Sequence, residues 1–156
     1  MKLYLVQHGA ARPKSEDRER PLTEVGRTDV ARVAALARRA GVEVHQIRHS
    51  DRRRAKETAA ILGEYLEPAQ GVTTMAGLRP KDDLRPVAEL LERATRPLML
   101  VGHRPFLERL AGLLLAEDEG RSVVSFQKGG LVCLTRNESR AWAVEWIITP
   151  DLVLQR

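Results

Sequence analysis

The stretch Leu98-Met99-Leu100-Val101-Gly102-His103-Arg104-Pro105 decides the fold class of this chain. Its four consecutive apolar residues are typical of a buried strand, and Gly102 and His103 mark the point where that strand enters a polar loop. The N-terminal stretch repeats the pattern, because the apolar run Leu3-Tyr4-Leu5-Val6 is followed by Gln7-His8-Gly9. Both stretches therefore predict a buried strand that ends in a loop carrying a histidine.

Helical patterns alternate with these strands. Thr23 is a candidate N-cap for a helix that runs to about Ala40, and Gly41 ends it. Apolar spacing predicts three more helices, and two further short strands are expected. The helices lie near residues 55–66, 87–94 and 107–114, and the strands near 46–50 and 72–74.

The end of the chain is rich in β patterns. Residues 123–126, 130–135 and 141–148 are predicted to be strands, and the turn at 136–139 joins the last two. Strands that alternate with helices and close with a β-rich tail predict the α/β class. We expect a three-layer α/β/α sandwich with a mainly parallel central sheet. No repeat or linker interrupts the chain, so a single domain over residues 1–156 is predicted.

The composition indicates a globular protein. Of its 156 residues, 43% are apolar and 30% are charged. No apolar run approaches the roughly 20 residues that span a bilayer, so no membrane partner is expected. The single cysteine, Cys133, excludes an internal disulfide and lies in an apolar run, which favours a buried structural thiol and a cytoplasmic location. No side chains have metal-ligand spacing, and neither a metal nor a cofactor is expected.

The net charge of +5 raises the question of nucleic-acid binding. The arginines are spread over several predicted helices, and aromatic residues that could stack on bases make up only 4% of the chain. We therefore expect no nucleic-acid partner. A basic surface also suits an acidic or phosphorylated partner.

Three polar segments follow predicted strands, and this is where ligands bind in open α/β sheets. These segments are residues 7–9, 50–54 and 102–104. Because the carboxyl ends of parallel strands meet at one edge of a sheet, His8, Arg54 and His103 are expected to converge. Gly9 permits an unusual backbone angle and the close approach of a ligand.

The residues of these segments resemble the histidine phosphatase superfamily. Val6-Gln7-His8-Gly9-Ala10 resembles its R-H-G signature, and the stretch at 101–105 resembles the segment with the second histidine. Residues 50–58 are similar to its S-P-x-x-R-A-x-x-T segment, with Asp51 in the proline position. Arg20-Pro21-Leu22-Thr23 resembles the segment that follows the signature. The short chain and its end at 146–150 look most like the SixA branch of phosphohistidine phosphatases, which implies a phosphoglycerate mutase-like fold.

The resemblance implies a role for each matched residue. His8 is implied to be the nucleophile that forms a phosphohistidine intermediate, and Arg54 to bind the phosphoryl oxygens. His103 is implied to stabilise the charge of those oxygens in the transition state. The implied partner is a phosphorylated protein of the histidine-containing phosphotransfer type, or a small phosphorylated substrate.

One residue departs from the family pattern. Gln7 stands where the family has an arginine, so the phosphate site loses a charged, bidentate donor. The cost is on the order of 10²-fold in rate, or about 3 kcal/mol, unless Arg12 or Arg20 compensates. The alternative hypothesis is a weakly active or inactive phosphatase-like module that binds a phosphorylated partner. A distant third is a basic nucleic-acid-binding domain.

The middle of the chain offers no clear general acid. Asp82 and Asp83 are the only candidates there, and neither matches a family motif. Because protonated imidazole is already a fair leaving group, this points toward a phosphoramidate substrate.

Several residues near these motifs have ordinary structural interpretations. Ser50 is interpreted as a helix N-cap, and His45 and His49 as strand-edge residues. The alternating Trp142, Val144 and Trp146 are expected to pack in the last strand.

Overall fold

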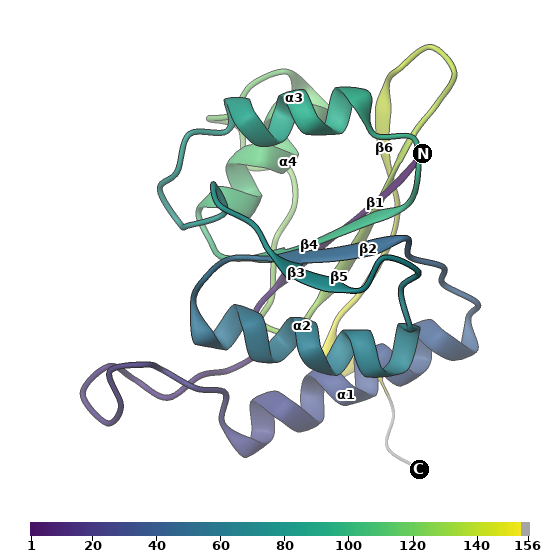
Figure 1. Cartoon of the computed structure of the whole chain (residues 1–156). Coiled ribbons are helices and arrows are strands. Elements are labelled where there is room, and N and C mark those ends of the chain that lie inside the picture. Colours follow the sequence, from purple (N-terminus) through teal and green to yellow (C-terminus); the bar gives the residue numbers. More distant parts are fainter. Residues whose placement is uncertain (154–156) are drawn as a thin grey trace.

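A computed structural model describes residues 1–153 of the chain (Figure 1). The elements follow in the order β1 (Lys2–Gln7), α1 (Glu24–Arg39), β2 (Gln46–His49), α2 (Arg53–Leu66), β3 (Val72–Thr74), α3 (Arg85–Arg93), β4 (Leu98–Gly102), α4 (Phe106–Ala116), β5 (Leu131–Arg136), β6 (Trp142–Ile148) and the 3₁₀ helix η1 (Pro150–Leu152). The predicted α/β class is confirmed. Among these residues, no helix has both the length and the apolarity that crossing a membrane requires.

One six-stranded sheet organises the fold, with the order β3-β2-β4-β1-β5-β6. Strands β3, β2, β4 and β1 pair in parallel, and the two C-terminal strands pair antiparallel. The sheet is therefore mainly parallel, as predicted. Figure 1 shows α1 and α2 on one face of it and α3 and α4 on the other, so the molecule has three layers.

Alternation along β1 divides the core into two apolar clusters. Leu3 and Leu5 pack with residues of α3 and α4, whereas Tyr4 and Val6 pack with residues of α1 and α2. By the same alternation, Gln7 follows the two leucines onto the α3–α4 side. All four apolar residues are almost fully buried, which accounts for the unbroken hydrophobic run.

Helix α1 begins and ends as the sequence predicts. The Thr23 hydroxyl accepts a hydrogen bond from the Gly26 amide at 3.0 Å, so Thr23 is the N-cap. Gly41 follows the helix with φ +77°, a conformation that favours glycine.

The strand predicted at residues 123–126 is wrong. Val124 and Phe126 are buried in the α3–α4 cluster, but their segment pairs with no strand. Its apolar residues signalled burial rather than β structure. The central strand β1 is already paired on both sides, with β4 and β5, so no place beside it is left for this segment.

The two tryptophans of the last strand pack against the core as expected, whereas Val144 is 43% exposed, and the alternation of the strand is broken. An irregularity between Cys133 and Leu134 shifts the pairing of β5 with β6. As a result, Trp142 packs against the α3–α4 cluster and Trp146 against the α1–α2 cluster. Cys133 is fully buried, as predicted.

Candidate active site

The carboxyl ends of three parallel strands meet at one edge of the sheet, as the sequence predicts. In the strand register, Gln7 lies beside Gly102, and His49 lies beside Val101. The chain leaves the strands in the same register, because the His8 amide donates to the Gly102 carbonyl at 3.0 Å. The edge therefore brings together the residues that follow β1, β4 and β2.

His8 is held as a neutral imidazole with an available lone pair. Its Nδ1 lies 2.7 Å from the Gly9 carbonyl oxygen. A carbonyl can only accept, so Nδ1 carries the proton and Nε2 does not. Arg54 Nε donates to this Nε2 at 3.3 Å. The pKa of His8 is lowered to about 4. Burial is the main cause, the Gly9 hydrogen bond opposes it, and the charge of Arg54 contributes to the lowering.

His103 lies beside His8, with 5.1 Å between the ring centroids. Its Nε2 is 2.6 Å from the Ser50 hydroxyl oxygen, which also accepts from the Arg52 amide at 3.3 Å. Since a hydroxyl can accept one hydrogen bond and donate another, Ser50 can donate its proton to Nε2, and the neutral ring then carries its own proton on Nδ1. Among the described residues this Nδ1 is buried without a partner. The pKa of His103 is lowered to about 3, chiefly by burial and to a smaller extent by His8 and Arg54.

Ser50 is thus a site residue that the sequence interpretation missed. The interpretation as the N-cap of α2 is wrong, because the N-cap position is Arg52 and no side chain caps the helix. His49 is more than a strand-edge residue, since it is only 4% exposed and its Nδ1 lies 2.8 Å from the Ser50 carbonyl oxygen. His45 is partly buried just before β2, outside the site.

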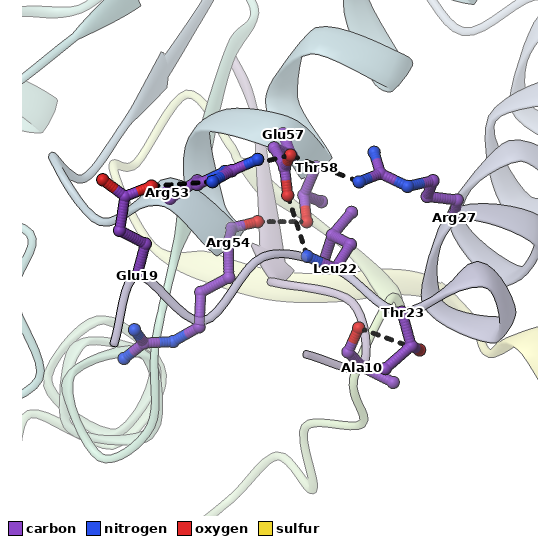
Figure 2. Close-up of polar contacts among 9 residues, drawn as sticks. All are labelled: Ala10, Glu19, Leu22, Thr23, Arg27, Arg53, Arg54, Glu57 and Thr58. Atoms are coloured by element: carbon purple, nitrogen blue, oxygen red, sulfur yellow. Dashed lines mark hydrogen bonds and ion pairs between the residues drawn. The ribbon is translucent and has the colours of Figure 1, made fainter. Parts of the chain in front are cut away.

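Thr58 connects the loop that begins at His8 to α2. Its hydroxyl accepts from the Gly9 amide at 3.0 Å and donates to the Arg54 carbonyl at 2.7 Å, a bond drawn in Figure 2. A Cβ on Gly9 would lie 2.9 Å from a methyl carbon of Val30 in α1. A packed helix therefore approaches Gly9 closely. The unusual backbone angle expected at Gly9 is wrong, because its φ is not positive, and the close approach of a ligand stays a prediction.

Of Arg12 and Arg20, the two arginines expected to compensate for Gln7, only Arg20 acts electrostatically on His8. The pKa values of His8 and Arg54 are both lowered, mainly by burial, and the positive charge of Arg20 contributes to both shifts. Arg20 has φ 50°, and its Nε donates to the Arg12 carbonyl at 3.2 Å. Arg12 itself is exposed and pairs with Glu16 at 3.5 Å.

Glu57 anchors this loop and was not predicted from the sequence (Figure 2). Its carboxylate accepts from the Leu22 amide at 2.8 Å and from Arg27 at 3.3 Å. It also pairs with Arg53 at 3.4 Å, and Arg53 reaches Glu19 in the loop at 2.6 Å. Two arginines and a backbone amide therefore share one carboxylate, which is 18% exposed. No motif marks Glu57, because its partners are distant in sequence.

Gln7 forms part of a cleft beside the histidines. The side chain is 6% exposed, and its Oε1 has no hydrogen-bond partner among residues 1–153. The cleft has a volume of about 510 Å³, and Arg104 and Lys128 also line it. Lys128 was not predicted from the sequence either, because it belongs to no recognisable motif.

The acidic candidates from the middle of the chain are engaged elsewhere. Asp82 accepts from the Arg79 amide at 2.9 Å, and Asp83 pairs with Arg85 at 2.8 Å. Asp51, in the family's proline position, pairs with Arg79 at 2.5 Å. Within the described part of the chain, no three metal-binding side chains gather into a site.

A neutral histidine with an available lone pair, beside an arginine and a second histidine, is an arrangement suited to phosphoryl transfer. The family model of the histidine phosphatase superfamily, branch 1, matches residues 3–82. An uncharacterized protein of Picosynechococcus is 31% identical over 150 residues, which cover 92% of this chain and 90% of that protein. The chain therefore belongs to the histidine phosphatase superfamily.

Solved structures show the same fold. The protein histidine phosphatase SixA, in complex with tungstate, is 22% identical with a TM-score of 0.84, over 97% of this chain and 98% of SixA. A mycobacterial glucosyl-3-phosphoglycerate phosphatase is 20% identical with a TM-score of 0.72, over 93% of this chain and 97% of its own. The phosphoglycerate mutase-like α/β fold is thus confirmed, and the family match together with these neighbours supports a phosphatase enzyme.

Proposed function

We propose that this chain is a phosphohistidine phosphatase that acts through a covalent intermediate on His8. The observation that carries the proposal is the unprotonated Nε2 of His8, 3.3 Å from Arg54 Nε. A phosphoryl group bound there would be in reach of a nucleophile that needs no prior deprotonation. The likeness to the protein histidine phosphatase SixA supports this substrate class.

In the first step, the lone pair of His8 Nε2 attacks phosphorus. The bond from phosphorus to the leaving nitrogen breaks, and its electron pair stays on that nitrogen, which is protonated as it leaves. Arg54 exchanges its bond to Nε2 for bonds to the phosphoryl oxygens. The unpartnered Nδ1–H of His103 donates to the same oxygens, which carry the transition-state charge.

In the second step, water attacks phosphorus and the bond to His8 Nε2 breaks. The electron pair returns to Nε2, and the Gly9 carbonyl holds the Nδ1 proton throughout. Asp82 and Asp83 are bonded to other groups, so neither is offered as the acid. A phosphoramidate has a basic leaving nitrogen that water can protonate, which favours it over an alcohol ester.

The missing arginine at Gln7 is offset by other positive charges. Arg20 and Lys128 both contribute to the lowered pKa of His8, after burial and Arg54. We therefore favour an active enzyme over a module that only binds phosphorylated partners. The substrate is proposed to be a phosphorylated protein of the histidine-containing phosphotransfer type, with a small phosphorylated compound as the other source. We further propose a cytoplasmic location and one domain over residues 1–156.

The test is phosphate release from a phosphohistidine-bearing protein, run beside p-nitrophenyl phosphate. Wild type is expected to release phosphate from the phosphoprotein, and His8→Ala is expected to release none. His45→Ala serves as the control, because it removes a histidine outside the site. Release that survives in His8→Ala would exclude the covalent mechanism. No release by the wild-type chain would instead support the binding module.

A further inference from the structure

Many cations around the two histidines are already neutralised by carboxylates. Exposed ion pairs of this kind attract little further negative charge, since each cation faces its own counter-charge. The pairs nearest the site are Arg12–Glu16, Arg53–Glu19, Arg79–Asp51 and Arg104–Glu108.

Four other cations act on the histidines and have no ion-pair partner within residues 1–153. Next to burial, which is the main cause, their charges lower the pKa of His8 or of His103. They are Arg20, Arg52, Arg54 and Lys128. The site therefore has more uncompensated positive charge than one phosphoryl group held by Arg54 and His103 requires.

Lys128 approaches from a different side than the three arginines. The arginines belong to α2 and to the two loops beside it, whereas Lys128 precedes β5. The amide of Gly129 donates to the carbonyls of Gln7 and His8, at 2.9 and 3.2 Å. This fixes the backbone of Lys128 directly against the nucleophile's strand end, while its side chain is exposed.

The cleft that Lys128 lines starts at the residue before the nucleophile. Gln7, 6% exposed, forms part of its wall, and Phe126 and Pro150 add apolar surface. The charged residues that line it are three cations and two carboxylates: Arg32, Arg104, Lys128, Asp29 and Asp151. Gln7 and Lys128 line this cleft, and the Gly129 amide beside Lys128 donates to the carbonyls of both Gln7 and His8, so the cleft lies next to the strand end that carries His8. A group in this cleft can therefore belong to the same substrate as a phosphoryl group at His8.

We propose that this cleft binds an anionic group on the leaving part of the substrate, a carboxylate or a second phosphate, and that Lys128 recognises it. The inference rests on the proposed function in placing the transferred phosphoryl group at His8. Arg104 is already paired with Glu108, and Arg32 also interacts with another group of the protein, so Lys128 is the cation of the cleft best placed to gain from a new partner. The preferred substrates are thus phosphorylated compounds or segments that carry a second negative charge close to the phosphoryl group.

The test is equilibrium binding to His8→Ala, which does not depend on turnover. Phenyl phosphate and 3-carboxyphenyl phosphate are compared by calorimetry at low salt. The carboxylated ligand is expected to bind about 3-fold more tightly, as for an exposed ion pair. In the His8→Ala background, Lys128→Gln should abolish the preference for the carboxylated ligand, and Lys128→Arg should keep it. Lys81→Gln, which removes an exposed lysine whose charge does not act on either histidine, should leave it unchanged.

Two results would overturn the proposal. One is equal affinity of the two ligands for His8→Ala. The other is an equal weakening of both ligands by Lys128→Gln, which would make Lys128 a partner of the transferred phosphoryl group itself. A wild-type chain that releases no phosphate would contradict the proposed function and leave this comparison valid.

A second pair of ligands identifies the source of the anion. Two phosphohistidine peptides are compared that differ by aspartate or asparagine beside the phosphorylated residue. A preference for the aspartate peptide that Lys128→Gln removes supports the subsite and points to acidic segments of a phosphoprotein. A preference confined to the aromatic pair supports the subsite and points to small phosphorylated acids.

Discussion

The burial of His8 predicts that acid destabilises this protein through a defined residue. Burial lowers the pKa of His8 from 6.5 to about 4 in the folded chain. Protonation therefore favours the unfolded chain, in which the imidazole is solvated. The stability that a neutral His8 provides is complete above about pH 6.5, decreases as the pH falls, and is lost below about pH 4.

The size of the effect follows from that pKa difference. One pKa unit corresponds to about 1.4 kcal/mol, so the complete loss is about 3 kcal/mol. Between about pH 7 and pH 5, the contribution of His8 to the free energy of unfolding decreases by about 2 kcal/mol. His103, with a pKa lowered to about 3 chiefly by burial, adds a loss of similar size over the same range.

The assay is urea unfolding of wild type and His8→Ala at a series of pH values. The wild-type free energy of unfolding is expected to decrease more between pH 7 and pH 5 than that of the variant, by about 2 kcal/mol. His45→Ala measures how much of any change follows from losing a histidine elsewhere. The reasoning is refuted if wild type and His8→Ala lose the same stability over this range, whatever their offset at pH 7.

Four further predictions concern the site. Arg54→Lys should lower kcat on the order of 10²-fold, because the planar donor beside His8 Nε2 is lost, and steady-state kinetics with p-nitrophenyl phosphate measures it. Ser50→Ala should lower kcat about 10-fold and Ser50→Thr much less, because only the hydroxyl fixes the proton of His103 on Nδ1; nitrogen NMR of the imidazole checks the tautomer. Gln7→Arg should raise kcat/KM by less than about 10²-fold and lower the Tm, because it adds a buried charge to a cleft wall that already holds Lys128 and Arg104. Glu57→Ala should raise KM more than it lowers kcat, because it releases the Leu22 amide and the loop that carries Arg20; an unchanged KM would contradict this.

The residues predicted from the sequence lie where strand ends impose a position. His8 and His103 each follow a buried parallel strand, and Arg54 stands in the first turn of the helix after a third. The end of a strand fixes where the following loop begins, so the positions predicted from the sequence motifs agree with the structure for these three residues. The predicted strand at 123–126 was wrong because no strand end fixes the position of this segment. Buried apolar residues alone do not show whether the segment can pair with a strand of the sheet.

The residues that sequence analysis missed depend on contacts between distant segments. Ser50 meets His103 across 53 positions of sequence, and its own neighbourhood suggests a helix cap. Glu57 reaches Leu22 across 35 positions, and the path of the intervening loop depends on that contact. A local pattern carries no information on such pairs, so the placement of Arg20 rather than Arg12 near the histidines could not be predicted either.

The structure changes the interpretation of Gln7, because it shows which positive charges act on His8. An arginine at position 7 would share the wall of the cleft with Lys128 and Arg104, where a further buried cation meets like charges. With glutamine there, the positive charge at the nucleophile comes instead from Arg54, Lys128 and Arg20, which belong to a helix, the segment before β5 and a loop. Within the described residues none of these three cations has an ion-pair partner. The positive charge at His8 therefore comes from three separate segments, and Lys128 is the one of the three that also lines the adjoining cleft proposed to bind a second anionic group.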